Sequence, residues 1–203
     1  MELRSILADL DLWLAEHAPG DHRQLMPPAD PERAAALAAG RFPVHEDVLV
    51  WLSVHDGSQR DPVPAAGAFV PHDFPLLGVS GMAQGLADMV EEVERAVEDG
   101  DEEFIVGLEA DERWLPVAMN HTGGRLVVDH RPGGDYGSVL EVDPSVGVNG
   151  VKRWDSLSHM FGAVLEALRT GSALVTGSGV KTVPRVEEPG DALPHVVWDL
   201  RFG

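Results

Sequence analysis

Histidine and carboxylate residues gather in one short stretch of the sequence, and these residue types can transfer protons or bind a metal. His121, Asp129, His130 and Asp135 lie between and beside two glycine-rich turns. An imidazole near a carboxylate can act as a general base, and histidine also ligates zinc. Successive strand residues point to opposite faces, so Asp129 and His130 are expected to diverge. We favour turn residues bonded to local backbone and water, and keep a small enzyme using His121, Asp129 and His130 as an alternative.

Other patterns resemble catalytic motifs but lack a required feature. Residues 177–182, GSGVKT, resemble a phosphate-binding loop, but Val180 stands where that motif has glycine and Pro184 opposes the helix that must follow. Residues 78–82, GVSGM, lack the second glycine of a nucleophile elbow. No H-E-x-x-H pair, calcium-loop spacing or cysteine occurs. The sequence therefore predicts no catalytic residue, no metal site and no cofactor.

An acidic run is the strongest charge feature of the chain. From Asp88 to Glu112 there are twelve carboxylates and one cation, Arg95. Acidic residues on a helix are usually its solvated face, but like charges repel and a basic partner would relieve that repulsion. Both interpretations stay open. The partner-binding hypothesis names six residues on and just beyond a predicted helix: Glu91, Glu94, Glu98, Asp101, Glu102 and Glu103.

The net charge of the whole chain limits its partners and its location. The formal charge is −19 and the isoelectric point is near 4.6. Such a chain repels nucleic acid and anionic membranes and favours a basic protein partner. The N-terminal segment carries acids within its apolar stripe, unlike a signal peptide, and no apolar run reaches the length of a membrane span. We therefore expect a cytoplasmic protein.

The elements that must position these residues can be read from periodicity and turn chemistry. Apolar runs bounded by Gly, Pro, Asn and Asp predict an antiparallel meander with strands at 114–119, 126–128 and 138–142, and an edge strand follows it at 148–154. Apolar residues at helical spacing predict helices at 2–17, 32–39, 42–57, 84–98 and 157–169. In the last helix Ser156 is the expected cap. Less regular segments predict short strands at 74–79 and 104–108 and loops at 20–31 and 58–73.

These elements predict one α+β domain, in which helices and edge strands lie against the meander. The side chains expected to form its core are Trp114, Leu115, Val117, Leu126, Val128 and Val139 on the strands, and Trp51, Leu52, Phe161 and Leu165 on the helices. In helix 84–98, Val90, Val93 and Val97 are expected to face this core. The tail has little periodicity, but its apolar segment 196–198 is expected to dock as a strand.

Several of these segments resemble the SUKH superfamily, the relatives of the fungal cell-wall-assembly and cell-proliferation coordinating protein. Residues 42–47, FPVHED, and 52–57, LSVHDG, resemble its "Leu-Pro … Leu … Asn/Asp-Gly" helix, with Phe42 in place of Leu. Residues 114–118, the Gly123–Gly124 turn, 126–129 and 137–139 resemble its "Trp-x-Pro-(Ile/Val)-Ala … Gly … Leu-x-x-Asp … Gly-x-Val" core. The resemblance covers residues 1–170 and leaves 171–203 as a C-terminal extension, expected to dock partly on the domain.

The resemblance implies an α+β fold in which helices pack on one side of a mainly antiparallel sheet. It implies no catalytic residues and no cofactor. Many bacterial members of that family are immunity proteins, which bind and neutralise a toxin domain, often a nuclease. It therefore implies a non-enzymatic binding module with a basic toxin domain as partner. A regulatory scaffold in growth or cell-envelope assembly, by analogy with the fungal relative, is an alternative. The family's recognition surfaces follow the individual toxin, so the resemblance assigns no binding residue here.

Overall fold

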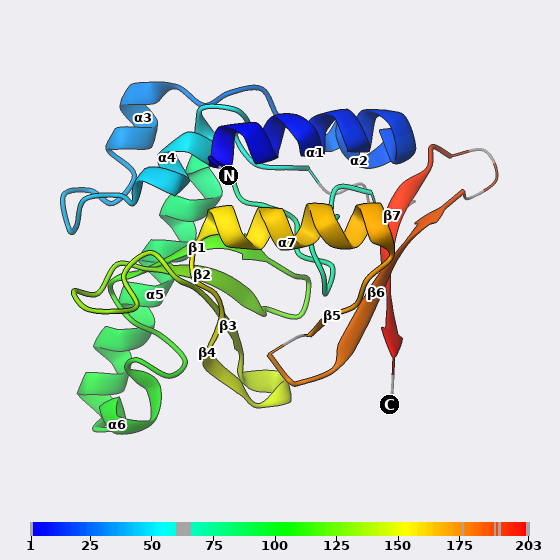
Figure 1. Cartoon of the computed structure of the whole chain (residues 1–203). Coiled ribbons are helices and arrows are strands. Elements are labelled where there is room, and N and C mark those ends of the chain that lie inside the picture. The colour runs from blue at the N-terminus through cyan, green and yellow to red at the C-terminus, as the bar shows by residue number, and fades with distance from the viewer. Residues whose placement is uncertain (1, 60–65, 176, 189, 191, 202–203) are drawn as a thin grey trace.

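The apolar runs in the middle of the chain form a four-stranded antiparallel meander in the order β1-β2-β3-β4, as seen in a computed structural model (Figure 1). The strands are β1 (Trp114–Met119), β2 (Arg125–Asp129), β3 (Val139–Asp143) and β4 (Val148–Trp154), with the 3-10 helix η1 (Pro144–Val146) before β4. The structure describes residues 2–59, 66–175, 177–188, 190 and 192–201. The predicted loop 58–73 therefore lies partly outside the described residues. Within them the predicted α+β class and its antiparallel meander are confirmed.

Seven α-helices surround the sheet in these described ranges. They are α1 (Leu3–His17), α2 (Pro19–Gln24), α3 (Pro31–Ala35), α4 (Glu46–Leu52), α5 (Val79–Asp99), α6 (Glu102–Ile105) and α7 (Leu157–Thr170). Those at α1, α3, α4, α5 and α7 fall where the sequence predicts helices, with α3 and α4 shorter than expected and α5 longer. The hydroxyl of Ser156 accepts a hydrogen bond from the amide of His159, which confirms it as the cap of α7.

Three of the irregular segments differ from their predictions. A loop is expected over 20–31, whereas α2 begins at Pro19, because proline suits the first turn of a helix. A strand is expected over 104–108, whereas α6 and a turn occupy this segment; Glu102 and Glu103 in the first turn favour the positive end of a helix dipole. Residues 74–79 run beside β1, where the amide of Leu77 donates to the carbonyl of Val117 at 2.8 Å, but make only isolated bridges.

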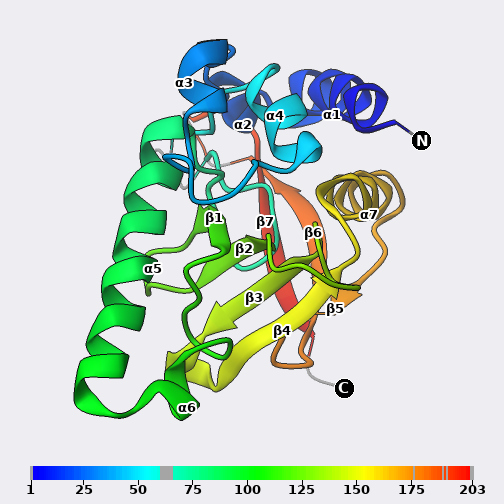
Figure 2. The same ribbon diagram turned by 90° about the vertical axis from the view of Figure 1, so that its left-hand side faces the viewer.

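Helices lie against both faces of the meander (Figure 2). One face packs with α1, α4 and α7 and contains the strand residues that the sequence places in the core: Leu115, Val117, Leu126, Val128 and Val139. The other face packs with Met89 of α5 and contains Trp114, Val127, Leu140 and Val142. All ten predicted core residues are buried. The prediction of helices on one side holds for α1, α4 and α7, and the structure adds α5 and α6 on the second face.

The tail forms a second antiparallel sheet of strands β5 (Leu174–Val175), β6 (Lys181–Glu187) and β7 (His195–Arg201). The predicted strand at 196–198 lies within β7. Hydrogen bonds between distant parts of the chain hold the tail against the rest of the protein. The amide of Val196 donates to the Asp21 carboxylate at 2.6 Å, the indole Nε1 of Trp198 donates to the Phe69 carbonyl at 3.0 Å, and the amide of Gly177 donates to Glu141 at 2.8 Å.

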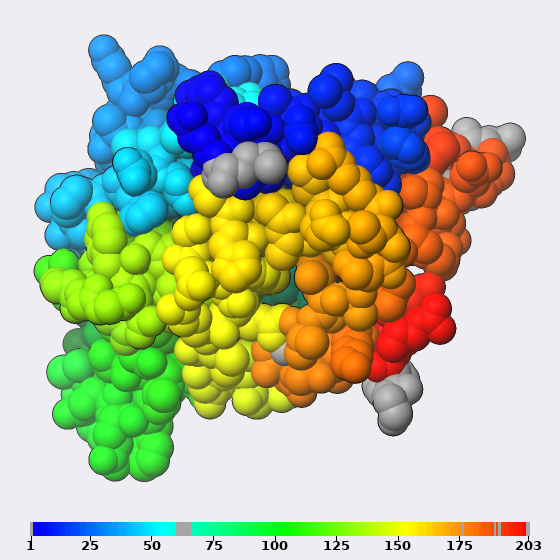
Figure 3. Space-filling model, in the orientation of Figure 1, coloured from blue at the N-terminus to red at the C-terminus, as the bar shows by residue number. Residues whose placement is uncertain are grey.

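The space-filling view shows how the helices close over the sheet (Figure 3). The N-terminal helices and α7 form a continuous upper surface, and the green segment around α6 stands out at the lower left. None of the helices in the described ranges combines the length and the apolar character that crossing a bilayer requires.

Candidate interaction surface

Helix α5 has an anchored half and an exposed half. Its first turns bury Met82, Leu86 and Met89 beside β1. The approach is close, because a Cβ added at Gly85 would lie 3.1 Å from the Pro116 ring. The helix continues past the sheet toward α6 (Figure 2). Its second half therefore presents most of its surface to solvent.

The six residues of the partner-binding hypothesis lie on this second half and on the segment that follows. All of them are exposed: Glu91, Glu94, Glu98, Asp101, Glu102 and Glu103. Gly100, at φ +79°, ends α5 in a left-handed conformation and turns the chain into α6. The last turn of α5 contains no basic residue, so Glu98 and Asp99 lie at the negative end of the helix dipole. That placement costs stability rather than adding it.

Some of the surrounding carboxylates have partners that sequence spacing does not reveal. Glu91 pairs with Arg95 at 2.9 Å, one helical turn away. Glu92 pairs at 2.9 Å with Arg125 of β2, a cation distant in sequence. Asp111 likewise lies 3.6 Å from Arg131. Among the residues that the structure describes, no ion pair is made by the other five candidates, which are Glu94, Glu98, Asp101, Glu102 and Glu103.

Exposed apolar side chains lie on the same segment as these unpaired carboxylates. Their exposure was not predicted from the sequence. Val97 is predicted to face the core but is 58% exposed, because the last turns of α5 extend beyond the sheet. Phe104 of α6 is 62% exposed. Val106 and Leu108 in the following turn are also exposed. We define the α5–α6 surface as the following exposed residues: Glu94, Val97, Glu98, Asp101, Glu102, Glu103, Phe104, Val106 and Leu108.

A hollow of about 610 Å³ lies beside this surface. Its apolar lining comes from Val93, Val97 and Val106, and its polar lining from the acids Glu102, Glu103, Asp111 and Glu112 with Arg113 and Arg131. Apolar and acidic residues therefore line the same hollow, together with two arginines. A partner carrying both basic and apolar side chains would match this pattern.

The alternative catalytic residues do not converge. His121 is exposed in the β1–β2 turn, with Nδ1 3.9 Å from Asp73. Asp129 and His130 lie at the opposite end of β2. Asp135 is exposed and lies 3.1 Å from the ammonium group of Lys152. In the described ranges, no three His, Asp or Glu side chains are placed together so that they could hold a metal ion.

Asp129 and His130 diverge, as strand alternation predicts, although both are buried. The carboxylate of Asp129 accepts hydrogen bonds from the Arg131 guanidinium at 2.7 to 3.1 Å. The Nδ1 of His130 lies 2.9 Å from the Val128 carbonyl, and its Nε2 accepts from the amide of His45 at 3.0 Å. Burial lowers the pKa of His130 to about 4. Its ring is therefore neutral near pH 7 and bonded entirely to backbone.

Comparison with known proteins gives no relative from which a function could be transferred. No protein-family model matches the sequence. A search of curated proteins likewise finds no match. The resemblance to the SUKH superfamily therefore depends on the order and spacing of its short motifs alone.

Proposed function

We propose that this protein is a non-enzymatic binding module of the immunity-protein type, which neutralises a toxin domain through the α5–α6 surface. The observation that carries the proposal is the combination of unpaired carboxylates and exposed apolar residues on that surface. Glu94, Glu98 and Glu102 are exposed on the same two elements as Val97 and Phe104, whose side chains are 58% and 62% exposed. The motif resemblance supplies the class of partner.

The chemistry of the surface indicates what kind of partner it would bind. Protein interfaces commonly have an apolar centre, often aromatic, within a polar rim. Phe104 and Val97 would form that centre, and the carboxylates would form the rim. Rim charges accelerate association with an oppositely charged protein. A nuclease must hold phosphates and is usually basic near its site, so a nuclease toxin fits an acidic surface.

A growth or cell-envelope scaffold would use the same surface with another basic partner. The two functions differ in what loss of the protein does to the cell. An immunity protein protects against a toxin made by the cell or its neighbours, so cells without it should be inhibited in co-culture with the parent strain. A scaffold mutant would show its growth or envelope defect in isolation. Affinity capture from the native cell would identify the partner in both cases.

The decisive variant reverses the charge of three unpaired carboxylates, as E94K/E98K/E102K. Association with the captured partner should slow at least tenfold and lose most of its dependence on salt, because the long-range attraction is removed. The free energy of unfolding should hold or rise slightly, since like-charge repulsion falls. A matched control, E16K/E32K/E166K, changes the net charge equally at exposed acids on α1, α3 and α7. Stopped-flow binding and urea denaturation would measure both effects.

A second variant tests the apolar centre without changing charge. Phe104→Ser should weaken partner binding about tenfold or more, as expected for an aromatic residue at the centre of an interface. Its effect on stability should stay within about 0.5 kcal/mol, because the side chain is already exposed. Leu12→Ser, at a 71% exposed apolar residue of α1, is the control. Unchanged protection and partner capture in both the triple variant and Phe104→Ser would refute the α5–α6 surface as the binding site.

A further inference from the structure

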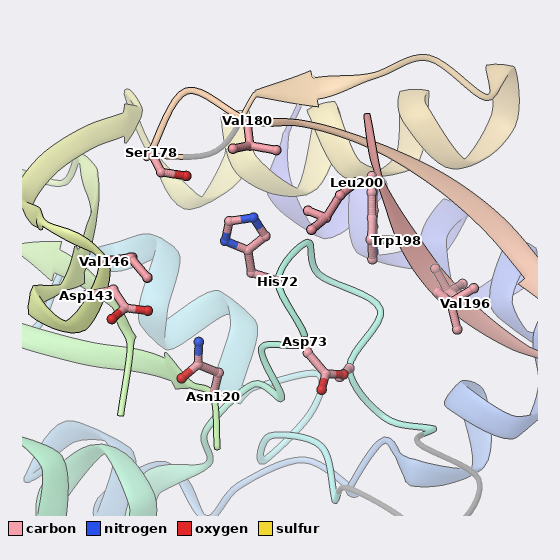
Figure 4. Close-up of a pocket in the computed structure, with 12 residues that line it drawn as sticks. His72, Asp73, Asn120, Asp143, Val146, Ser178, Val180, Val196, Trp198 and Leu200 are labelled. Carbon is pink, nitrogen blue, oxygen red and sulfur yellow. The ribbon is translucent and has the colours of Figure 1, made fainter. Parts of the chain in front are cut away.

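A cavity of about 500 Å³ lies between the meander and the C-terminal sheet (Figure 4). Its walls come from four distant parts of the chain: the segment 68–73, the β1–β2 turn, the β3–η1 junction and the tail. It is unrelated to the α5–α6 surface. The lining includes the polar residues Asn120 and Asp143, His72 near the centre, and the apolar residues Trp198 and Leu200.

One end of the cavity carries an oriented carboxylate and amide. The Oδ1 of Asn120 accepts hydrogen bonds from the amides of Thr122 at 3.1 Å and Gly124 at 2.8 Å. That fixes the side chain and leaves its Nδ2 on the cavity side (Figure 4). Asp143 lies beside it, because a Cβ added at Gly124 would be 2.7 Å from Asp143 Oδ2 and 2.8 Å from Asn120 Nδ2. Because residue 124 is glycine, no side chain at this position crowds the Asp143 carboxylate or the Asn120 amide.

The opposite end is apolar and is provided by the tail. Trp198, Leu200 and Val196 of β7 lie across the cavity from Asp143 (Figure 4). The indole of Trp198 is held in place because its Nε1 donates to the Phe69 carbonyl. Leu200 is 52% exposed, so this wall is open to entry from solvent. A ligand would therefore meet a polar group at one end and apolar side chains at the other.

His72 stands between the two ends in a backbone conformation that costs energy. His72 and Asp73 have φ values of +67° and +62°, in the left-handed region that disfavours residues with a Cβ. An Asn-Gly pair would form such a turn at lower cost. Strain of this kind is typical of sites where side chains must be held for binding. The Nδ1 of His72 lies 3.4 Å from the buried Glu141, which orients the ring within the cavity.

We infer that this cavity binds a small organic cation, a protonated amine attached to an aromatic or aliphatic body. The described lining contains two carboxylates, Asp73 and Asp143, and no Lys or Arg. Asp143 accepts the ammonium group, and the apolar body contacts Trp198 and Leu200. A cation also gains from the net charge of −19 over the whole chain, whereas an anion is repelled. The volume fits a ligand of this size.

Three probes that share a phenylethyl body and differ in charge test the inference: phenethylamine, 2-phenylethanol and 3-phenylpropionate. Isothermal titration calorimetry and NMR chemical-shift mapping on the full chain would measure affinity and location. We expect the amine to bind at least tenfold more tightly than the propionate, with the alcohol between them. The shifted signals should include Trp198 Nε1 and the side-chain amide of Asn120. Preference for the propionate, equal binding of all three, or no binding would overturn the inference.

Two conservative variants separate a site from general charge attraction. Asp143→Asn should reduce amine affinity at least fivefold, while the alcohol binds as before. Asn120→Asp keeps the acceptor for the turn amides, adds a carboxylate and should raise amine affinity. Asp99→Asn removes the same charge from the exposed end of α5 and should change nothing. An equal loss in Asp99→Asn and Asp143→Asn would mean that the amine is attracted by net charge alone. None of these results depends on partner binding at the α5–α6 surface.

Discussion

His130 is buried because each face of the meander is covered, and this changes the meaning of a residue that by type could do acid–base chemistry. Strand alternation correctly predicts that Asp129 and His130 diverge. It does not predict the burial of His130, because Phe42 and His45, which contact the His130 ring, are distant from it in sequence. The His130 ring joins β2 to the start of α4, since it contacts the Val128 carbonyl and the His45 amide. Its role in the fold is structural.

We predict that His130 makes the protein less stable as the pH falls from 7 to 5. Burial, only partly offset by the Val128 carbonyl, lowers the pKa of His130 to about 4, whereas an unfolded chain has a histidine pKa of about 6.5. The unfolded state therefore binds the proton first, and stability present above pH 6.5 is lost toward pH 4. Over pH 7 to 5 the loss should be about 2 kcal/mol, measured by urea denaturation.

His55 provides an internal contrast of opposite sign. Burial acts to lower its pKa, but the hydrogen bond and charge of Asp11, with the Met26 carbonyl, raise it overall. Its contribution to stability is therefore present below pH 6.5 and is lost as the pH rises through its folded pKa. His130→Gln should remove the acid-side loss, and His55→Gln should steepen it. An NMR titration that places the His130 pKa near 6.5 would contradict the prediction.

Some elements form a conformation that the local sequence determines, and others form one that depends on tertiary packing. The meander and α1 were predictable, because their apolar periods are regular and their turns contain Gly, Pro and Asn. Helix α6 was not, because a run such as FIVGL has strand-forming residues, and its helical start depends on the turn that Gly100 makes. Val97 was assigned to the core from helical spacing alone, but the last turns of α5 extend beyond the sheet and leave Val97 58% exposed. Helical periodicity identifies the apolar face of α5, but it does not show how much of that face packs against the sheet.

At this scale the contact between α4 and α7 gives a test. Trp51 and Phe161 stack with ring centroids 5.2 Å apart, and both side chains are buried. Phe161→Ala should lower the free energy of unfolding by about 3–5 kcal/mol, through lost burial and the cavity that remains. Leu12→Ala, at an exposed residue of α1, should change it by less than about 0.5 kcal/mol. A loss below 1 kcal/mol for Phe161→Ala, in chemical denaturation, would show that the helices repack.

At the scale of the whole molecule, the tail completes a structure that the sequence divides at residue 170. The acidic residues of the α5–α6 surface were identifiable because they are adjacent in sequence. The cavity was not, because Asn120, Asp143 and Trp198 come together only when the second sheet docks. The apolar segment 196–198 predicts that the tail docks as a strand, but local patterns do not show where it docks. Its fixed points are buried polar groups, and a tail of low periodicity gives no sign of them.

Asp21 is the most buried of these points, and its replacement should loosen the tail selectively. Its carboxylate is fully buried and accepts hydrogen bonds from Gly67 at 2.7 Å and Val196 at 2.6 Å. Asp21→Asn puts an NH₂ group against one of these amides, so one buried hydrogen bond is lost, which costs about 1–3 kcal/mol.

Burial raises the pKa of Asp21. The contribution of Asp21 to the free energy of unfolding is therefore greatest below an unfolded pKa of about 3.9, and it declines as the pH rises through the folded pKa.

Hydrogen exchange would locate the effect of Asp21→Asn. Amides of β6 and β7 should exchange at least tenfold faster, while those of β1 to β3 keep their protection, because the meander has its own core. Asp199→Asn, at a half-exposed residue of β7 paired with Arg185, is the control and should leave both sheets unchanged. Amine binding to the cavity should weaken in step with β7 exchange, since Trp198 and Leu200 leave with the strand. Uniformly faster exchange in both sheets would mean that the tail and the meander unfold as one unit.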